Sequence, residues 1–190
     1  LDLGRSAACA VATTGDVYCW GTTGSNIPAR AEQVGGFTSV RVVADAHCGM
    51  RSAPGIWCWG VDPARQLGTF DAPDANGRIA APSVVPGTDS LVSYSLGEDG
   101  TGLFACGRTA SGRALCWGSD RFGQLGVDGV DPAGSPIPSE VAGDRRFRDV
   151  RAGFRSACAV DLAGNAWCWG ENGAGRLGDG TLAPRRTPGA

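Results

Sequence analysis

The chain has 190 residues, of which 31 are Gly and 11 are Pro, and 42% of the residues are hydrophobic. This composition supplies enough apolar material for a core, but it contains too much glycine for a helical bundle. The formal net charge is −2 and all 17 basic residues are Arg, which argues against a nucleic-acid surface and excludes chemistry that needs a lysine.

Alternating apolar runs of strand length recur along the chain. They lie at residues 37–43, 91–97 and 147–153, and residues 1–4 resemble the end of another such run. Alternation with a period of two is typical of half-buried β-strands. We therefore expect an all-β fold.

Each run is followed by two cysteines ten residues apart, and the second cysteine is followed by Trp-Gly. This spacing recurs four times, with the cysteines at Cys9 and Cys19, Cys48 and Cys58, Cys106 and Cys116, and Cys158 and Cys168. Three of the units also carry Leu-Gly at one fixed offset after the tryptophan, at residues 67–68, 125–126 and 177–178. Self-similarity of this kind indicates a repeat protein. The approximate repeats are residues 1–36, 37–88, 89–146 and 147–190, which together form one segment of 1–190.

The ten-residue spacing predicts a β-hairpin within each repeat. Folding the first unit about Thr14 pairs Cys9 with Cys19 and leaves a three-residue loop that ends at Gly15. Glycine suits the left-handed conformation that such a loop needs in third place, and Gly112 and Gly164 occupy the same position. In the second unit Pro54-Gly55 is displaced by one residue, so we expect a different turn there.

The same register predicts disulfide bonds. Cys9 and Cys19 fall on a non-hydrogen-bonded pair, where the Cα atoms are about 4.5 Å apart, and this separation suits a disulfide. The tryptophan that follows the second cysteine then points to the opposite face of the sheet. Because every repeat carries it, we expect it to serve packing.

Metal binding is the alternative use of eight cysteines. No Cys-x2-Cys pair is present, and one histidine, His47, cannot complete four sites. We therefore expect disulfides, no metal and no cofactor. Four disulfides predict an oxidising compartment, either secreted, periplasmic or at the cell surface. No apolar run approaches the roughly 18 residues of a membrane span, so we expect no membrane insertion.

The repeats resemble those of the regulator-of-chromosome-condensation family. The resemblance spans the four units, and it is carried most clearly by residues 153–160 and 164–178 and by Phe122-Gly123-Gln124-Leu125-Gly126. It implies a β-propeller in which each repeat supplies one blade. Seven blades are usual in the family, so four repeats imply part of a larger propeller. The paired cysteines resemble secreted or surface-exposed bacterial members of the family.

The chain departs from the family pattern at one repeated position. Family repeats commonly carry a histidine two residues before the first cysteine, where this sequence has Ala7, Ala46, Phe104 and Ser156. This departure and the near-neutral charge argue against transfer of nucleotide-exchange activity. A second branch of the family comprises secreted inhibitors of β-lactamase, which fits an oxidising compartment.

The sequence contains only incomplete or misplaced matches to known catalytic and ligand-binding motifs. Residues 100–105 match Gly-x-Gly-x-x-Ala, but they run into the Cys106 hairpin and not into a helix. No Gly-x-Ser-x-Gly occurs, and residues 74–77 lack the first and last ligands of a calcium loop. We expect no catalytic residues, and the chain is predicted not to be an enzyme.

The loops after Trp-Gly differ between units and are the candidates for function. Asp120, Arg121 and Phe122 combine an aromatic ring with both charge signs, as interface anchors often do, and Arg65 and Glu171 lie on neighbouring loops. The predicted function is a non-enzymatic extracellular protein-binding module that uses propeller rim loops. The alternatives are a structural component of a surface or filament complex, or an inhibitor of a secreted enzyme. The expected partner is a protein or further copies or segments that complete the propeller, and not nucleic acid.

Overall fold

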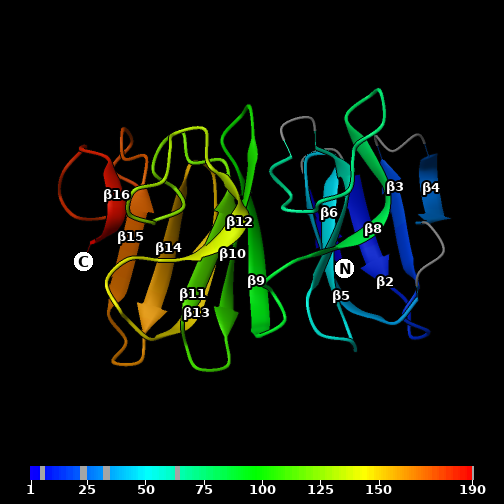
Figure 1. The fold of residues 1–190 in the computed structure, drawn as a ribbon, viewed down its shortest axis with the longest axis horizontal. Coiled ribbons are helices and arrows are strands. Elements are labelled where there is room, and N and C mark those ends of the chain that lie inside the picture. The colour runs from blue at the N-terminus through cyan, green and yellow to red at the C-terminus, as the bar shows by residue number, and fades with distance from the viewer. Residues whose placement is uncertain (5–6, 22–24, 32–34, 63–64, 190) are drawn as a thin grey trace. The chain divides into compact units, whose positions relative to one another are not determined.

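The structure is a computed structural model that describes residues 1–190 except 5–6, 22–24, 32–34, 63–64 and 190. Residue contacts divide the chain into two compact units, Leu1–Asp89 and Ser90–Ala190. Each unit contains two four-stranded antiparallel sheets in which the strands pair in chain order (Figure 1). Each sheet lies within one of the four repeats that the sequence predicts.

The first unit contains strands β1 to β8. Its first sheet consists of β1 (Asp2–Leu3), β2 (Ala7–Val11), β3 (Val17–Gly21) and β4 (Ser25–Arg30). Its second sheet consists of β5 (Phe37–Val43), β6 (Ala46–Arg51), β7 (Ile56–Val61) and β8 (Arg78–Val85).

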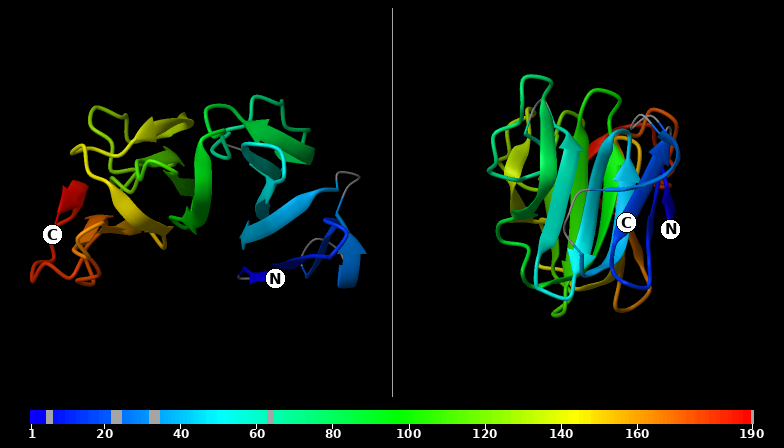
Figure 2. Two further views of the ribbon diagram at one scale, coloured as in Figure 1. Left: turned by 90° about the horizontal axis from the view of Figure 1, so that it is seen from below. Right: turned by 90° about the vertical axis from the view of Figure 1, so that its right-hand side faces the viewer.

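The second unit repeats this plan with strands β9 to β16. One sheet consists of β9 (Leu91–Glu98), β10 (Leu103–Thr109), β11 (Ala114–Gly118) and β12 (Ser135–Glu140). The other consists of β13 (Phe147–Ala152), β14 (Ser156–Asp161), β15 (Ala166–Gly170) and β16 (Arg185–Gly189). The strands of each sheet run alongside one another (Figure 2). Among the described residues, no helix is long and apolar enough to cross a membrane.

The central hairpins confirm the predicted turns. Gly15, Gly112 and Gly164 have φ angles of 82°, 86° and 93°. Each of these amides donates to the carbonyl three residues earlier, at 2.9, 2.9 and 3.1 Å. The second hairpin differs, as expected, because its last paired residues are Met50 and Ile56, with Gly55 at φ 101° just before the returning strand.

All four predicted disulfides are present. They join Cys9 to Cys19, Cys48 to Cys58, Cys106 to Cys116, and Cys158 to Cys168, with Cα atoms 4.1 Å apart in each case. In every pair the two cysteines are directly opposed in the register of the central hairpin. Each disulfide therefore cross-links the two middle strands of one sheet.

The predicted alternation of sulfur and indole faces determines how the sheets pack. In the first unit Trp59 belongs to the core cluster that contains Cys9 and Cys19 of the preceding sheet. In the second unit Trp169 belongs to the cluster that contains Cys106 and Cys116. Within each unit, the tryptophan face of one sheet thus covers the disulfide face of the sheet before it. Trp59, Trp117 and Trp169 are at most 3% exposed, which confirms their packing role.

Candidate partner-binding site

Antiparallel strand order places four connections of the second unit at the same ends of their sheets. Strands β9, β11, β13 and β15 all end there, so the connections at residues 99–102, 119–134, 153–155 and 171–184 follow them. Two of the predicted partner-binding stretches, Asp120 to Phe122 and Glu171, lie in these connections. Arg65 is exposed on the corresponding loop of the first unit.

Asp99 is the buried centre of these connections and is 1% exposed. Its Oδ1 accepts hydrogen bonds from the amides of Thr101 and Gly102 at 2.8 and 2.7 Å, and its Oδ2 accepts one from the Ser119 hydroxyl at 2.6 Å. Burial by itself would raise the pKa of Asp99, but the hydrogen bonds from Ser119, Thr101 and Gly102 outweigh it and hold that pKa below the ordinary value. The carboxylate therefore stays charged and ties two loops together.

Gln124 extends this network to the backbone of the predicted anchor. Its side-chain amide donates to Asp99 at 3.3 Å, and its Oε1 accepts a hydrogen bond from the Phe122 amide at 2.8 Å. Gln124 is fully buried. The buried Gln124 side chain therefore fixes the backbone of the loop at Phe122. A loop that is already ordered loses less conformational entropy when it binds a partner.

The structure gives Asp120 a different place from its two neighbours. Its carboxylate is 1% exposed, accepts a hydrogen bond from the Leu125 amide at 2.9 Å and pairs with Arg186. Arg121 is exposed and Phe122 is half-buried. Asp120 thus holds the loop in position, whereas the Arg121 side chain and part of the Phe122 side chain lie at the surface.

The residue at the position of Asp120 has the same structural role in three repeats, and the sequence did not lead us to predict that role. Asp62 and Asn172 occupy the same offset after Trp-Gly. Their side-chain oxygens accept hydrogen bonds from Leu67 and Leu177 at 3.0 Å, as Asp120 does from Leu125. An Asp or Asn five residues before each Leu-Gly was the signal that could have identified this role, because Asx side chains commonly bond to nearby backbone amides.

Arginines and phenylalanines interleave on the surface above this network. The guanidinium of Arg155 lies 4.6 Å from the ring centroid of Phe122 and 4.7 Å from that of Phe154. Arg121 lies 5.9 Å from the Phe122 centroid, and Arg176 lies 5.8 Å from that of Phe154. We call these five residues the arginine–aromatic surface. Contacts at these distances are within the range of cation–π attraction.

Arg155 is the residue that organises this surface. It has a φ angle of 59°, its Nε donates to the Asp99 carbonyl at 2.7 Å, and its amide donates to the Glu98 carbonyl at 2.9 Å. A non-glycine residue in the left-handed region is uncommon and usually reflects a local constraint. Here the constraint directs the guanidinium between two aromatic rings that come from different sheets.

A groove adjoins this surface. It has a volume of about 360 Å³ and combines apolar side chains with arginines at its edges; its lining residues are Arg121, Phe122, Glu171, Asn172, Gly173, Leu182, Pro184 and Arg186. Leu182 is 67% exposed. Glu171 pairs with Arg176 at 3.0 Å. The groove therefore presents apolar contact area beside cationic groups, and the structure brings Arg121, Phe122 and Glu171 together on it.

The chain consists of repeated four-stranded antiparallel sheets, stacked in pairs by a repeated tryptophan, and this arrangement is that of blades in a β-propeller repeat protein. Residues 111–160 match the Regulator of chromosome condensation (RCC1) repeat. The ultraviolet-B receptor UVR8 of Arabidopsis thaliana is 26% identical over 202 residues, which cover 97% of this chain and 44% of that protein. Residues 111–160 thus match one RCC1 repeat, and the chain is similar along most of its length to proteins that carry such repeats.

Two further comparisons give similar results. The mitochondrial RCC1 domain-containing protein RUG3 of Arabidopsis thaliana is 26% identical over 85% of this chain and 39% of its own length. The crystal structure of Prp20p from Saccharomyces cerevisiae has a TM-score of 0.84 at 17% identity, covering 97% of this chain and 48% of that chain. The chain spans less than half the length of each of these proteins, so the fold corresponds to part of a propeller.

Proposed function

We propose that this chain is a non-enzymatic protein-binding module whose contact surface is the arginine–aromatic surface and its groove. The observation that carries the proposal is the placement of Arg155 between Phe122 and Phe154 at 4.6 and 4.7 Å, above a buried hydrogen-bond network. Aromatic and arginine side chains dominate interface energetics when a scaffold holds them rigidly. Prp20p, which shares the fold, was studied for its binding to Gsp1p and histones.

The charge of this site favours an acidic partner. Arg121 and Arg186 line the groove and Arg155 and Arg176 belong to the adjoining surface, against three carboxylates, Asp99, Asp120 and Glu171. Asp99 is buried beneath this surface, where the Ser119 hydroxyl and the amides of Thr101 and Gly102 hold its charge. Asp120 is already neutralised by Arg186, and Glu171 by Arg176. The charges of Arg121 and Arg155 remain for a partner. We infer that the partner carries a carboxylate next to an aromatic or aliphatic side chain.

The compartment is part of the same proposal. Four disulfides are compatible with an oxidising environment, and they support a secreted or cell-surface location for the chain. The similar protein RUG3 is mitochondrial, so similarity to RCC1-repeat proteins is also compatible with other locations. Alkylation of freshly isolated protein without reduction, followed by mass spectrometry, tests this point: unlabelled cysteines support it and labelled cysteines contradict it.

Selection from a phage-displayed library of random peptides tests the binding function. We expect enriched peptides to contain Asp or Glu beside an aromatic or aliphatic residue, and to lose binding to a chain that carries both Arg121→Ala and Phe122→Ala. Arg145→Ala is the matched control, because Arg145 lies over the Trp167 ring at 3.8 Å but belongs to the opposite ends of the strands. Peptides without acidic residues, or peptides that bind the double variant equally well, would contradict the proposal.

Assembly with further blades is a second candidate function. The Cys158–Cys168 disulfide and Trp167 are only half-buried, whereas the other three disulfides are at most 5% exposed. In each unit a disulfide face is covered by the tryptophan face of the next sheet, so this last disulfide face is suited to receive another blade. Sedimentation over a range of concentrations tests this function, because a mass that stays monomeric contradicts self-association.

A further inference from the structure

A buried histidine of the first unit lies against a disulfide of the neighbouring sheet. His47 precedes Cys48 in β6, yet its Nδ1 lies 3.5 Å from the Sγ of Cys9. The imidazole is 1% exposed and lies against the Trp59 ring, with centroids 5.5 Å apart. In the disulfide the Cys9 sulfur carries no proton, so the imidazole is the donor in this contact.

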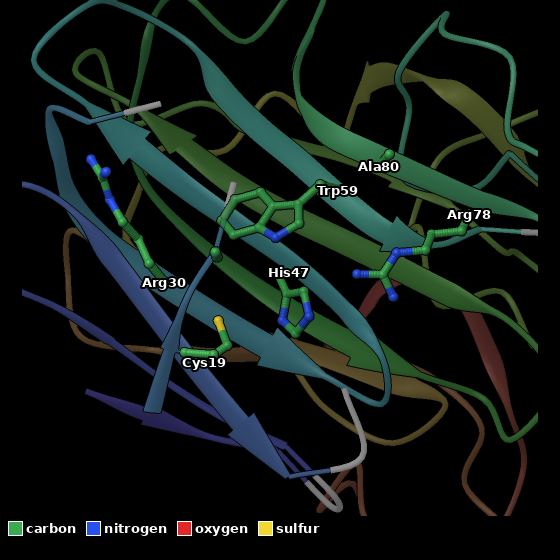
Figure 3. A pocket seen from close by; sticks show the side chains of 8 residues that line it. Cys19, Arg30, His47, Trp59, Arg78 and Ala80 are labelled. Carbon is green, nitrogen blue, oxygen red and sulfur yellow. The ribbon is translucent and has the colours of Figure 1, made fainter. Parts of the chain in front are cut away.

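A small cavity connects this cluster to the outside. It has a volume of about 150 Å³, and Cys19, His47, Trp59, Arg30 and Arg78 are among its lining residues (Figure 3). Cys19 belongs to this lining, so the cavity gives a small reductant or an ion a route towards the disulfide.

The second unit contains the same disulfide without the imidazole. Ala157 pairs with Trp169 as His47 pairs with Trp59, and it packs in the cluster of Cys106 and Cys116. Both disulfides have Cα atoms 4.1 Å apart. The chain therefore supplies its own comparison, in which one cysteine pair faces a histidine and the equivalent pair faces an alanine.

We propose that, after reduction of the Cys9–Cys19 disulfide, Cys9, Cys19 and His47 form a binding site for one zinc ion. The three ligand atoms lie within 4.8 Å of one another. Two thiolates and one imidazole are ligands that zinc prefers, at about 2.3 Å for sulfur and about 2.0 Å for nitrogen. Zinc binding requires the side chains to rearrange until the three atoms reach those distances, and we place the fourth ligand in the cavity that Cys19 and His47 line.

The chemistry balances with a dithiol as reductant. The dithiol gives two electrons and two protons to the Cys9–Cys19 bond, which becomes two thiols, while the dithiol becomes a disulfide. Zinc then displaces the two thiol protons and binds both thiolates. The resulting complex of one Zn²⁺, two thiolates and a neutral imidazole has no net charge. The nearby Arg78 guanidinium therefore does not oppose it.

The site would exchange a covalent cross-link between β2 and β3 for a metal cross-link that also joins β6. Formation of the site would depend on the redox state of the compartment, since an oxidising environment keeps the disulfide. This inference concerns the first unit and does not rest on the proposed partner-binding site.

Cobalt titration of the reduced full chain tests the proposal. The chain is reduced with a phosphine under anaerobic conditions, its sheet content is checked by circular dichroism, and Co²⁺ is added. We expect one ion per chain with thiolate-to-cobalt charge-transfer absorption, and displacement of that ion by Zn²⁺. His47→Ala should weaken binding by at least the roughly 100-fold that loss of even an outer-shell partner can produce.

Two controls make the result decisive. A chain with Cys106→Ser and Cys116→Ser should bind cobalt as the unaltered chain does. In the unaltered reduced chain, zinc should slow the alkylation of Cys9 and Cys19 relative to the zinc-free chain, and it should leave the alkylation rate of Cys106 and Cys116 unchanged. Equal affinity of His47→Ala, or equal protection of both cysteine pairs, would overturn the proposal, and so would a reduced chain that binds no cobalt.

Discussion

The single histidine of the chain makes its stability depend on pH in a defined window. Burial lowers the pKa of His47 from 6.5 to about 4; the charge of Arg78 acts in the same direction, and that of Asp45 opposes it. The unfolded chain therefore binds a proton below pH 6.5 that the folded chain does not accept until about pH 4. By linkage, stability is complete above pH 6.5 and falls as the pH decreases towards 4.

The size of this effect follows from the two pKa values. A shift from 6.5 to about 4 corresponds to a loss of about 3 kcal/mol in the free energy of unfolding once His47 is protonated in both states. About 2 kcal/mol of this is lost between pH 7 and pH 5. The pKa values of Asp99 and Asp161 are lowered in the folded chain, so their contribution to stability is lost only as the pH falls below the ordinary pKa of 3.8. Between pH 7 and pH 5 these two carboxylates therefore contribute almost nothing to the change in stability.

Guanidinium unfolding of the unreduced chain, followed by tryptophan fluorescence at pH 7 and pH 5, measures the effect. The matched variant is His47→Gln, which is neutral at both pH values. Burial raises the pKa values of Asp62 and Asp120, so these groups act in the opposite direction, but they do so equally in both proteins. A loss of the same size in His47→Gln, or no loss in the unaltered chain, would show that His47 does not cause the pH dependence.

Three further predictions follow from single residues. Gly164→Ala should lower the free energy of unfolding by about 1–2 kcal/mol in chemical denaturation, because φ is 93° while nothing lies within 4 Å of an added Cβ; an unchanged midpoint would contradict this. Asn172→Ala should lower the free energy of unfolding by about 1–3 kcal/mol, because the buried Leu177 amide loses its acceptor. A change within experimental error would contradict this. Hydrogen bonds from the Trp167 indole and from Asn165 lower the pKa of Asp161 to about 2, so the indole proton resonance should titrate near pH 2 in NMR spectra, and a midpoint near 3.8 would contradict the hydrogen bond.

Local features of the fold could be predicted from the sequence because their causes lie within one repeat. The pairing of Cys9 with Cys19 depends only on hairpin register and on the loop that ends at Gly15. Alternation along a strand likewise placed Trp59 on the face opposite its own disulfide. The residues that determine these features lie at most a dozen positions apart in the sequence.

Features that join different repeats could not be predicted in this way. His47 contacts Cys9, 38 positions away, and Arg155 lies over Phe122 from another sheet. Both contacts depend on how two sheets stack, which no spacing within one repeat encodes. Asp120 was predicted as a partner contact because it stands beside Arg121 and Phe122 and completes a set with an aromatic ring and both charge signs. Its carboxylate instead accepts a hydrogen bond from the Leu125 amide beneath the loop.

The central claim is that the arginine–aromatic surface of the second unit binds an acidic partner. Its most direct test is calorimetric titration of the full chain with the tightest acidic peptide from the selection described above. We expect Arg121→Ala with Phe122→Ala to weaken binding by about 30-fold or more, equivalent to about 2 kcal/mol, and Arg145→Ala to have no effect. Equal affinity of the double variant, or an equal loss in Arg145→Ala, would contradict the claim.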